Sequence, residues 1–333
     1  MRRNTSRRMI RGTAGTAFIA ALLLAAFPAR GFEAGGGPET VVGNWPHVQL
    51  TVQTAIGRLN GDARELVFGW DENGNRYKGS ELIWDLKGLT MGGITASAKI
   101  YKRYHVSFGY WGAINEGDGR MEDFDWFIPG GEWTDWSLSD VKVDQGSLID
   151  LNSSIDAWRG HGVTLSGLVG YRRDIWSWRD YGIRHIYSTN PYSPYGFRDN
   201  VEEDPHTTGI TYRQVIRIPY AGVQATGDFG PVQLRAYGAY SPFVSADDFD
   251  THVYTETEYE ETFSGGSFYG FGLACSWRAW KNLFITLAYD YQNVPEIQGD
   301  MTYRSPDGQG TIADNAGLKN TFSMYSFRVG YTF

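Results

Sequence analysis

Cysteine is almost absent from this sequence, which has 333 residues and one thiol, that of Cys275. One thiol cannot form an internal disulfide bond, which excludes the small secreted modules built on a disulfide framework. Positive charge is also scarce, because 30 Lys and Arg stand against 38 Asp and Glu, for a formal net charge of -8. This balance argues against nucleic acid as a partner and favours basic partners.

Long apolar runs are missing after the N-terminal region, and the mean hydropathy is -0.38. The one apolar stretch, residues 17–27, follows five arginines and precedes small residues at 29–31. It is too short to cross a bilayer, which takes roughly 20 residues, and the arrangement is typical of a secretory signal. We therefore expect residues 1–31 to be a cleaved signal peptide, with a membrane anchor as the alternative, and 32–333 to form one exported domain.

Aromatic residues and glycine are abundant, with 21 Tyr, 18 Phe, 12 Trp and 42 Gly. This composition favours a sheet protein whose alternate residues face different media, with aromatic girdles at two interfaces. The C-terminus shows the alternation most clearly, since every second residue is apolar in a series that ends the chain: Tyr325, Phe327, Val329, Tyr331 and Phe333. The pattern resembles the closing strand of outer-membrane barrels.

Period two dominates the rest of the sequence. Short polar connections alternate with longer polar segments, which we place at 69–79, 113–142, 179–208, 247–266 and 299–319. The strands expected between them are 47–68, 80–100, 104–114, 144–157, 162–178, 209–226, 231–246, 267–280, 283–298 and 319–333. The sequence therefore predicts an all-β fold, a ten-stranded antiparallel transmembrane β-barrel in an outer membrane, with long extracellular loops.

Two acidic segments in different predicted loops stand out. Residues two apart in extended backbone point to the same side, so Asp123 and Asp125 form one couple and Asp250 and His252 another. Asp248 falls on the second face as well. If both segments surround one lumen, His252 can act as general base on a water molecule while Asp250 stabilises the imidazolium. From these residues alone, a solvated or cation-binding acidic loop stays an open alternative.

The two segments resemble the omptin family over nearly the whole mature chain. The family's Asp-x-Asp-Trp segment corresponds to residues 123–126 in the second long loop, and its Asp-x-His segment to 250–252 in the fourth. Supporting matches are the segments 57–61, 133–135, 196–199, 218–220 and 330–333. The resemblance implies an outer-membrane endopeptidase with no cofactor, whose active site faces the cell exterior and uses the two couples to activate water.

The resemblance also implies a specificity for basic residues. In the family, a Glu on the first strand and an Asp two residues before the catalytic Asp bind the Arg or Lys that precedes the cleaved bond. Those positions are Glu65 and Asp248, and Asp135 matches a position near the following residue, so we expect dibasic sites to be preferred. Considered without the resemblance, Glu65 could instead form an ion pair with Arg58 or Arg64.

Two further catalytic interpretations are weaker. Ser137 lacks the Gly-x-Ser-x-Gly surroundings of a nucleophilic serine, and Ser139 stands where relatives often carry a histidine. His185 and His206 lie near the acidic residues 202–204, but their spacing matches no metal-binding template, so we expect no metal.

Family members also depend on lipopolysaccharide held by basic residues on the outer wall. The corresponding residues are Tyr171, Arg172, Arg173 and Arg217. The sequence departs from the family at Ile175 and Val215, where relatives often carry Arg, so this lipid site is altered or displaced.

We expect a monomer whose partners are basic peptides or proteins and outer-membrane lipid. The rival function is a non-catalytic adhesin or small channel on the same barrel. Side chains fill the lumen of a ten-stranded barrel, which disfavours a wide pore, whereas aromatic loop residues at 181–195 suit protein contact.

Overall fold

The computed structural model describes residues 47–204 and 207–333, so the expected signal peptide lies outside the described residues. All of its regular elements are strands. They are β1 (Val48–Trp70), β2 (Arg76–Asp85), β3 (Leu89–Ile100), β4 (Tyr104–Ala113), β5 (Gly119–Asp125), β6 (Asp135–Gly160), β7 (Val163–Tyr187), β8 (Asn200–Asp204), β9 (Ile210–Phe229), β10 (Val232–His252), β11 (Thr257–Arg278), β12 (Leu283–Ser305) and β13 (Gly308–Thr332).

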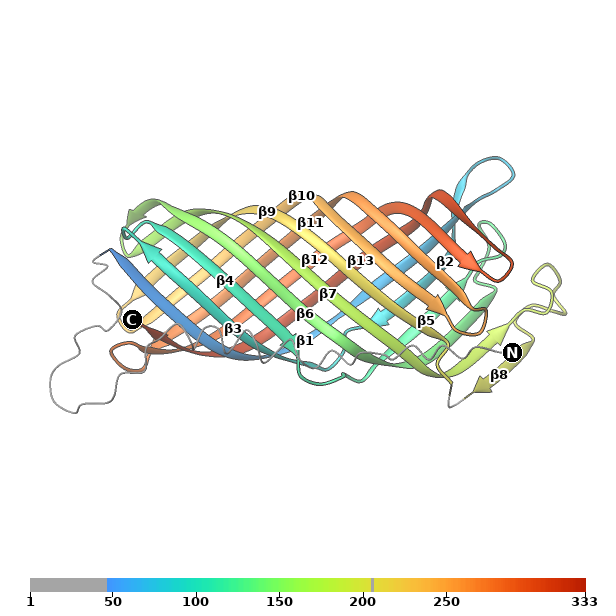
Figure 1. Cartoon of the computed structure of the whole chain (residues 1–333), viewed down its shortest axis with the longest axis horizontal. Coiled ribbons are helices and arrows are strands. Elements are labelled where there is room, and N and C mark those ends of the chain that lie inside the picture. The colour runs from blue at the N-terminus through green and yellow to red at the C-terminus, as the bar shows by residue number, and fades with distance from the viewer. Residues whose placement is uncertain (1–46, 205–206) are drawn as a thin grey trace, which may run out of the picture. The chain divides into compact units, whose positions relative to one another are not determined.

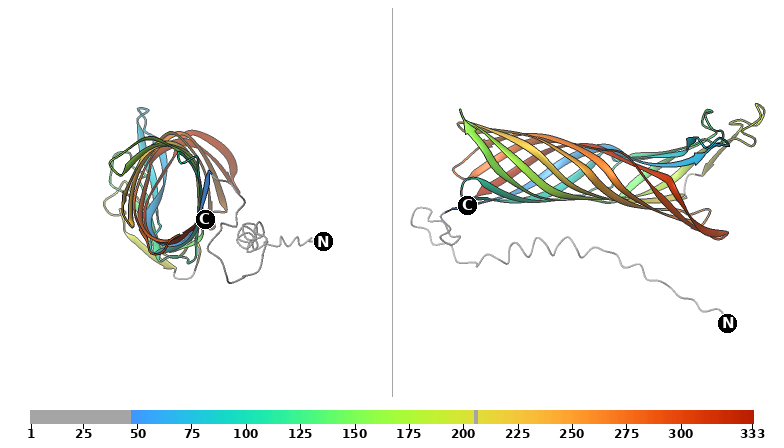
Figure 2. Two further views of the ribbon diagram at one scale, coloured as in Figure 1. Left: turned by 90° about the vertical axis from the view of Figure 1, so that its left-hand side faces the viewer. Right: turned by 90° about the horizontal axis from the view of Figure 1, so that it is seen from above.

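Ten of these strands close into an antiparallel ring. The order around it is β1, β3, β4, β6, β7, β9, β10, β11, β12 and β13, and β13 pairs with β1 again (Figure 1; Figure 2 shows the ring end-on). Towards one end, β2 and β5 replace β3 and β4, because β2 pairs with β1 and β5 pairs with β6. The predicted ten-stranded β-barrel is confirmed.

The last strand shows why the ring closes. On β13, Tyr325 and Phe327 are exposed on the outer wall, whereas Met324 and Ser326 are buried in the lumen. The same alternation puts a belt of large apolar side chains outside on neighbouring strands, including Val169, Val223, Leu234, Leu273 and Leu287. A closed ring leaves no unpaired strand edge, and an apolar outer belt over a polar interior suits a lipid environment.

In the described residues, 47–204 and 207–333, no helix has the length and apolar character to cross a membrane.

The two ends of the barrel differ in their connections. At the end that holds the C-terminus, tight turns join β6 to β7 and β9 to β10, and they contain Gly162 at φ 79° and Gly230 at φ 65°. Glycine adopts a positive φ at little cost, which explains its place at these turns, and His161 beside Gly162 also has a positive φ, of 51°. At the opposite end, β2, β5 and β8 extend the wall (Figure 1).

The strands reach further than the sequence analysis expected. Segments 247–266 and 299–319 were expected as loops, but β10 and β11 run to a turn at 253–256, and β12 and β13 run to a turn at 306–307. That expectation was wrong because the apolar alternation fades where the outer face no longer meets lipid. The hydrogen-bonded ladder between strands needs no such alternation and continues.

Side chains fill the barrel interior below the open end. Trp84 packs on Tyr212 with ring centroids 5.3 Å apart, Trp178 packs on Tyr212 at 5.6 Å, and the two tryptophan rings lie 6.1 Å from each other. All three residues are almost fully buried. Their packing closes the lumen and forms a rigid base for the residues above it.

Candidate active site

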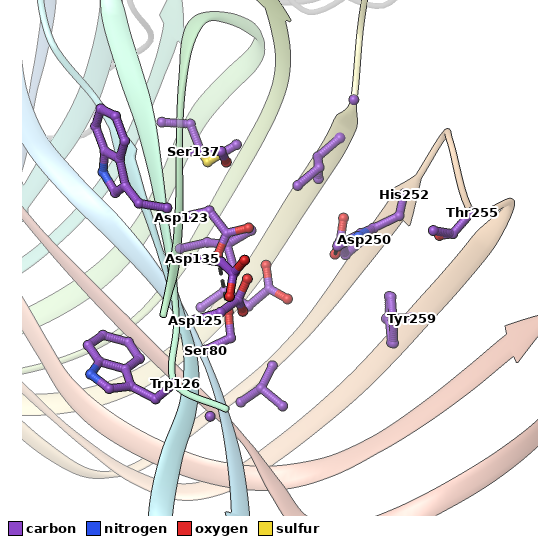
Figure 3. Close-up of a pocket in the computed structure, with 18 of the residues that line it drawn as sticks. Ser80, Asp123, Asp125, Trp126, Asp135, Ser137, Asp250, His252, Thr255 and Tyr259 are labelled. Carbon is purple, nitrogen blue, oxygen red and sulfur yellow. Dashed lines mark hydrogen bonds and ion pairs between the residues drawn. The ribbon is translucent and has the colours of Figure 1, made fainter. Parts of the chain in front are cut away.

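A cavity of about 570 Å³ opens among the extended strands at the end opposite the C-terminus. Figure 3 shows Asp123, Asp125 and Ser80 on one wall and Asp250 and His252 on the facing wall. The two couples that the sequence placed in separate segments therefore line one cavity.

The first wall is formed by β2 and β5. Asp123 and Asp125 are two residues apart on β5, and both side chains point into the cavity (Figure 3). Ser80 on β2 donates a hydrogen bond from Oγ to Asp123 Oδ1 at 3.1 Å. Burial, and then repulsion by Asp125, raises the pKa of Asp123; burial also raises the pKa of Asp125, against the stabilising effect of Ser80. The couple therefore tends to retain a proton near neutral pH.

The facing wall carries the imidazole. His252 Nε2 lies 2.8 Å from Asp250 Oδ2, and Asp250 is buried. Burial alone would lower the pKa of His252, but Asp250, and then Asp123 and Asp125, outweigh it and raise the pKa. Figure 3 shows Asp250 and His252 across the cavity from Asp123 and Asp125, and all four residues line it.

Strand pairing fixes where this histidine points. His252 stands opposite Ile210 on β9 and Thr257 on β11, so neighbouring strands hold its backbone on both sides. Its ring also packs edge-on against Tyr259 at 5.2 Å between centroids. A catalytic side chain on a paired strand is positioned more firmly than one on a free loop.

The residues expected to bind a basic side chain lie deeper. Glu65 on β1 lines the cavity, and Asp248 is buried near it, where it accepts a hydrogen bond from Tyr212 at 2.9 Å. Burial raises the pKa of Glu65 and raises that of Asp248 to about 8. Arg64 bonds Asp62 and Glu81 instead of Glu65, so the alternative ion pair with Arg64 is not formed.

Asp135 and Ser137 lie on β6 at the rim of the same wall. Asp135 stands opposite Asp125, lines the cavity, and accepts a hydrogen bond from the Ser188 backbone N–H at 3.0 Å. Ser137 stands opposite Asp123 and also lines the cavity. Asp135 thus adds a third carboxyl to the wall that carries Asp123 and Asp125.

Several residues that line the cavity or are buried beside it were missed by the sequence analysis. Ser80 supports Asp123, Glu261 stands opposite Asp248, and Asp180 accepts backbone hydrogen bonds from Gly209 at 2.7 Å and Ile210 at 2.8 Å. Alternation with a period of two within the polar segments could have indicated strands and the side chains that face the cavity. Those segments were interpreted as loops, where no alternation is expected.

The residues expected to bind lipid do not all face lipid. Tyr171 is exposed, and Arg173 stands directly opposite Arg217 on the next strand, with Arg217 paired to Asp247. Arg172 instead points into the lumen, where its Nε lies 2.8 Å from the buried Asp174. The assignment of Arg172 to the outer wall was wrong, because successive residues of a strand face opposite sides.

In the part of the chain described, 47–204 and 207–333, no group of three or more His, Cys, Asp or Glu is arranged to hold a metal ion. His206, one of the residues considered for such a site, lies outside the described residues.

The chain is similar in sequence and in fold to known outer-membrane proteases. The chain is 25% identical over 281 residues to the plasminogen activator of Yersinia pestis, with 81% of this chain and 85% of that protein covered. It is 23% identical to the outer membrane protease OmpP of Escherichia coli K12, covering 86% and 90% of the two chains. The crystal structure of the outer membrane protease OmpT from Escherichia coli matches with a TM-score of 0.79 at 22% identity, over 86% of this chain and 97% of that one. The model of the Omptin family matches residues 47–333, and the chain therefore belongs to the omptin family.

Proposed function

We propose that this protein is an outer-membrane endopeptidase that cleaves peptide bonds after basic residues, with its cavity open to the cell exterior. The observation that carries the proposal is the convergence of an imidazole–carboxylate ion pair and a carboxyl couple on one cavity. The relatives named as outer membrane proteases, OmpP of Escherichia coli and IcsP of Shigella flexneri, support the same reaction class.

The proposed mechanism uses water as the nucleophile. A water held between the walls gives a proton to His252 as its oxygen attacks the carbonyl carbon, and Asp250 stabilises the imidazolium. The couple Asp123–Asp125 orients the water and holds a proton near the developing oxyanion. When the C–N bond breaks, His252 returns its proton to the leaving amine. The balance is one water consumed and two peptide ends formed.

Substrate selection is assigned to the acidic floor and rim. Glu65 and Asp248 would pair with the Arg or Lys side chain before the cleaved bond, and Asp135 with a basic residue after it. Their burial supports this assignment, because a cation that enters the cavity meets carboxylates shielded from water.

Replacement of the imidazole tests the reaction. In refolded protein with lipopolysaccharide, His252→Ala should abolish cleavage of an Arg-Arg peptide, a loss of roughly 10⁴-fold. Thr251→Ala, next to it on β10, is the matched control and should retain activity. Undiminished cleavage by His252→Ala would rule out the mechanism.

Lipopolysaccharide is proposed as the lipid partner of the monomeric barrel, through Tyr171, Arg173 and Arg217. The adjacent Arg173 and Arg217 support this, because two cations side by side suit a lipid phosphate. Double replacement of both arginines by Ala should raise the lipid concentration needed for half-maximal activity. An unchanged requirement would exclude this site.

Adhesion is retained as a second function because of one observation. The hairpin between β7 and β8 exposes Tyr192 and Tyr195, and Tyr192 bonds the Phe127 carbonyl. Exposed aromatic side chains suit protein contact. Binding of host matrix proteins to His252→Ala protein, lost on removal of residues 191–195, would establish it; binding unaffected by that removal would dismiss it.

A further inference from the structure

A third buried carboxyl lies beside the two that are proposed to bind the basic side chain. Glu261 stands directly opposite Asp248 in the β10–β11 ladder, so both side chains point to the same side of the sheet. Each residue is 1% exposed. Glu261 also interacts electrostatically with Glu65, which lines the cavity. Strands β1, β10 and β11 thus bring three carboxyls to one buried place.

These carboxyls have few partners in the residues that the structure describes, 47–204 and 207–333. Tyr212 donates to Asp248, but neither oxygen of Glu261 and not Oε2 of Glu65 receives a hydrogen bond from a protein donor. The same described residues contain no arrangement of acidic ligands suited to a metal ion. Buried acceptors without donors are costly, and a ligand rich in N–H groups would satisfy them.

We propose that Glu261 is a specificity-determining residue of the basic-residue pocket, where an arginine side chain contacts three carboxyls. This inference rests on the proposed protease function for its natural substrate, although binding itself needs no cleavage. A guanidinium presents five N–H donors in a planar fork, whereas an ammonium is a compact charge. Three acceptors on different strands therefore favour arginine over lysine.

The surroundings of Glu261 decide how binding depends on pH. The ionisable groups that face it are Asp248 and Asp250 on β10, Glu65 on β1, Tyr212 on β9 and Tyr259 on its own strand. Its partner on β12 is Met301, which carries no charge. Burial, and then Asp248 and Glu65, raises the pKa of Glu261. An entering cation favours the ionised carboxyls, so affinity should rise with pH, by about tenfold per unit for each proton released.

Calorimetric titration of the refolded full chain with n-propylguanidinium and n-butylammonium tests this without any cleavage. At pH 6, 7 and 8, in buffers of different ionisation enthalpy, the guanidinium should bind more tightly and release protons. Glu261→Gln should lower the guanidinium-to-ammonium affinity ratio roughly tenfold and flatten the pH dependence. Glu260→Gln is the matched control, because Glu260 pairs with Arg304 on the outer wall and should change neither.

An unchanged affinity ratio and proton release in Glu261→Gln would overturn the inference. If Glu261→Gln does not fold, Glu261→Asp keeps the acid but shortens it, and it should lower the affinity ratio while protons are still released. Cation binding with these properties in a protein that cleaves no peptide would support the role of Glu261 and reject only the protease. If the protein cleaves peptides but Glu261→Gln changes neither the affinity ratio nor the proton release, the protease is supported and the role of Glu261 is rejected.

Discussion

The middle of the lumen and the cavity above it both bury acidic side chains, but they treat the charges differently. In the middle of the lumen, Arg172 pairs with Asp174 at 2.8 Å and Arg328 pairs with Asp290 at 2.7 Å. In the cavity, no lysine or arginine forms an ion pair with Glu65 or Asp248 in the described part of the chain, 47–204 and 207–333. Removal of one partner from a buried ion pair leaves an uncompensated charge and destabilises the fold, whereas buried carboxyls without a cationic partner are candidates for a ligand site.

The presence or absence of a cationic partner distinguishes the carboxyls of the two regions. Composition alone cannot distinguish these carboxyls, because all of them are acidic residues of one barrel. The contrast in pairing separates carboxyls that have a buried cationic partner from those without one, which we propose to bind a cationic substrate, and each region can be altered without the other.

The largest effect is expected in the cavity. Asp250→Asn should lower kcat/KM for an Arg-Arg peptide by roughly 10⁴-fold, because the imidazolium loses its counter-charge and its orientation. Unfolding in denaturant should change by less than about 1 kcal/mol, because the loss of the pair with His252 is offset by relief of the repulsion between Asp250 and the neighbouring Glu65 and Asp248. A mutant that lost stability but kept activity would erase the distinction between the two regions.

A smaller effect of the opposite kind is expected in the middle of the lumen. Asp174→Asn leaves the Arg172 guanidinium without its buried partner and should cost about 3 kcal/mol of unfolding free energy. The remaining folded protein should cleave peptide normally. Asp144→Asn, which breaks the exposed pair with Arg179, is the control and should cost under about 1 kcal/mol. Equal losses in both mutants would show that burial does not set the difference.

The smallest effect concerns pH. His252 must be neutral to accept a proton, so kcat/KM should rise with pH through its pKa, which lies above the ordinary value of 6.5. The rate should fall again as the acidic couple loses its proton, because the pKa of Asp123 is raised to about 8. Asp125→Asn removes the like charge that contributes to this shift, and the falling limb should move to lower pH by about one unit. If the falling part of the pH–rate profile stays at the same pH in Asp125→Asn, the proton lost there does not belong to Asp123.

Much of the barrel could be predicted from the sequence because lipid imposes a strict alternation. Tyr325 and Phe327 had to face outward, and the even strand count followed from the turns between such segments. The alternation did not predict how far strands continue beyond the lipid, so Asp250 and His252 were placed in a loop although they lie on β10. It also misplaced Arg172, whose inward direction follows from its register.

By itself the sequence determined the ring of strands and the identity of the two couples, since period two and the spacing of Asp123, Asp125, Asp250 and His252 are local properties. Only the tertiary structure decided that the couples face each other and that Glu261 joins Asp248 and Glu65 in one buried cluster. The physical reason is that these meetings depend on closure of the ring and on register across several strands. Neither can be deduced from the neighbours of a residue along the chain.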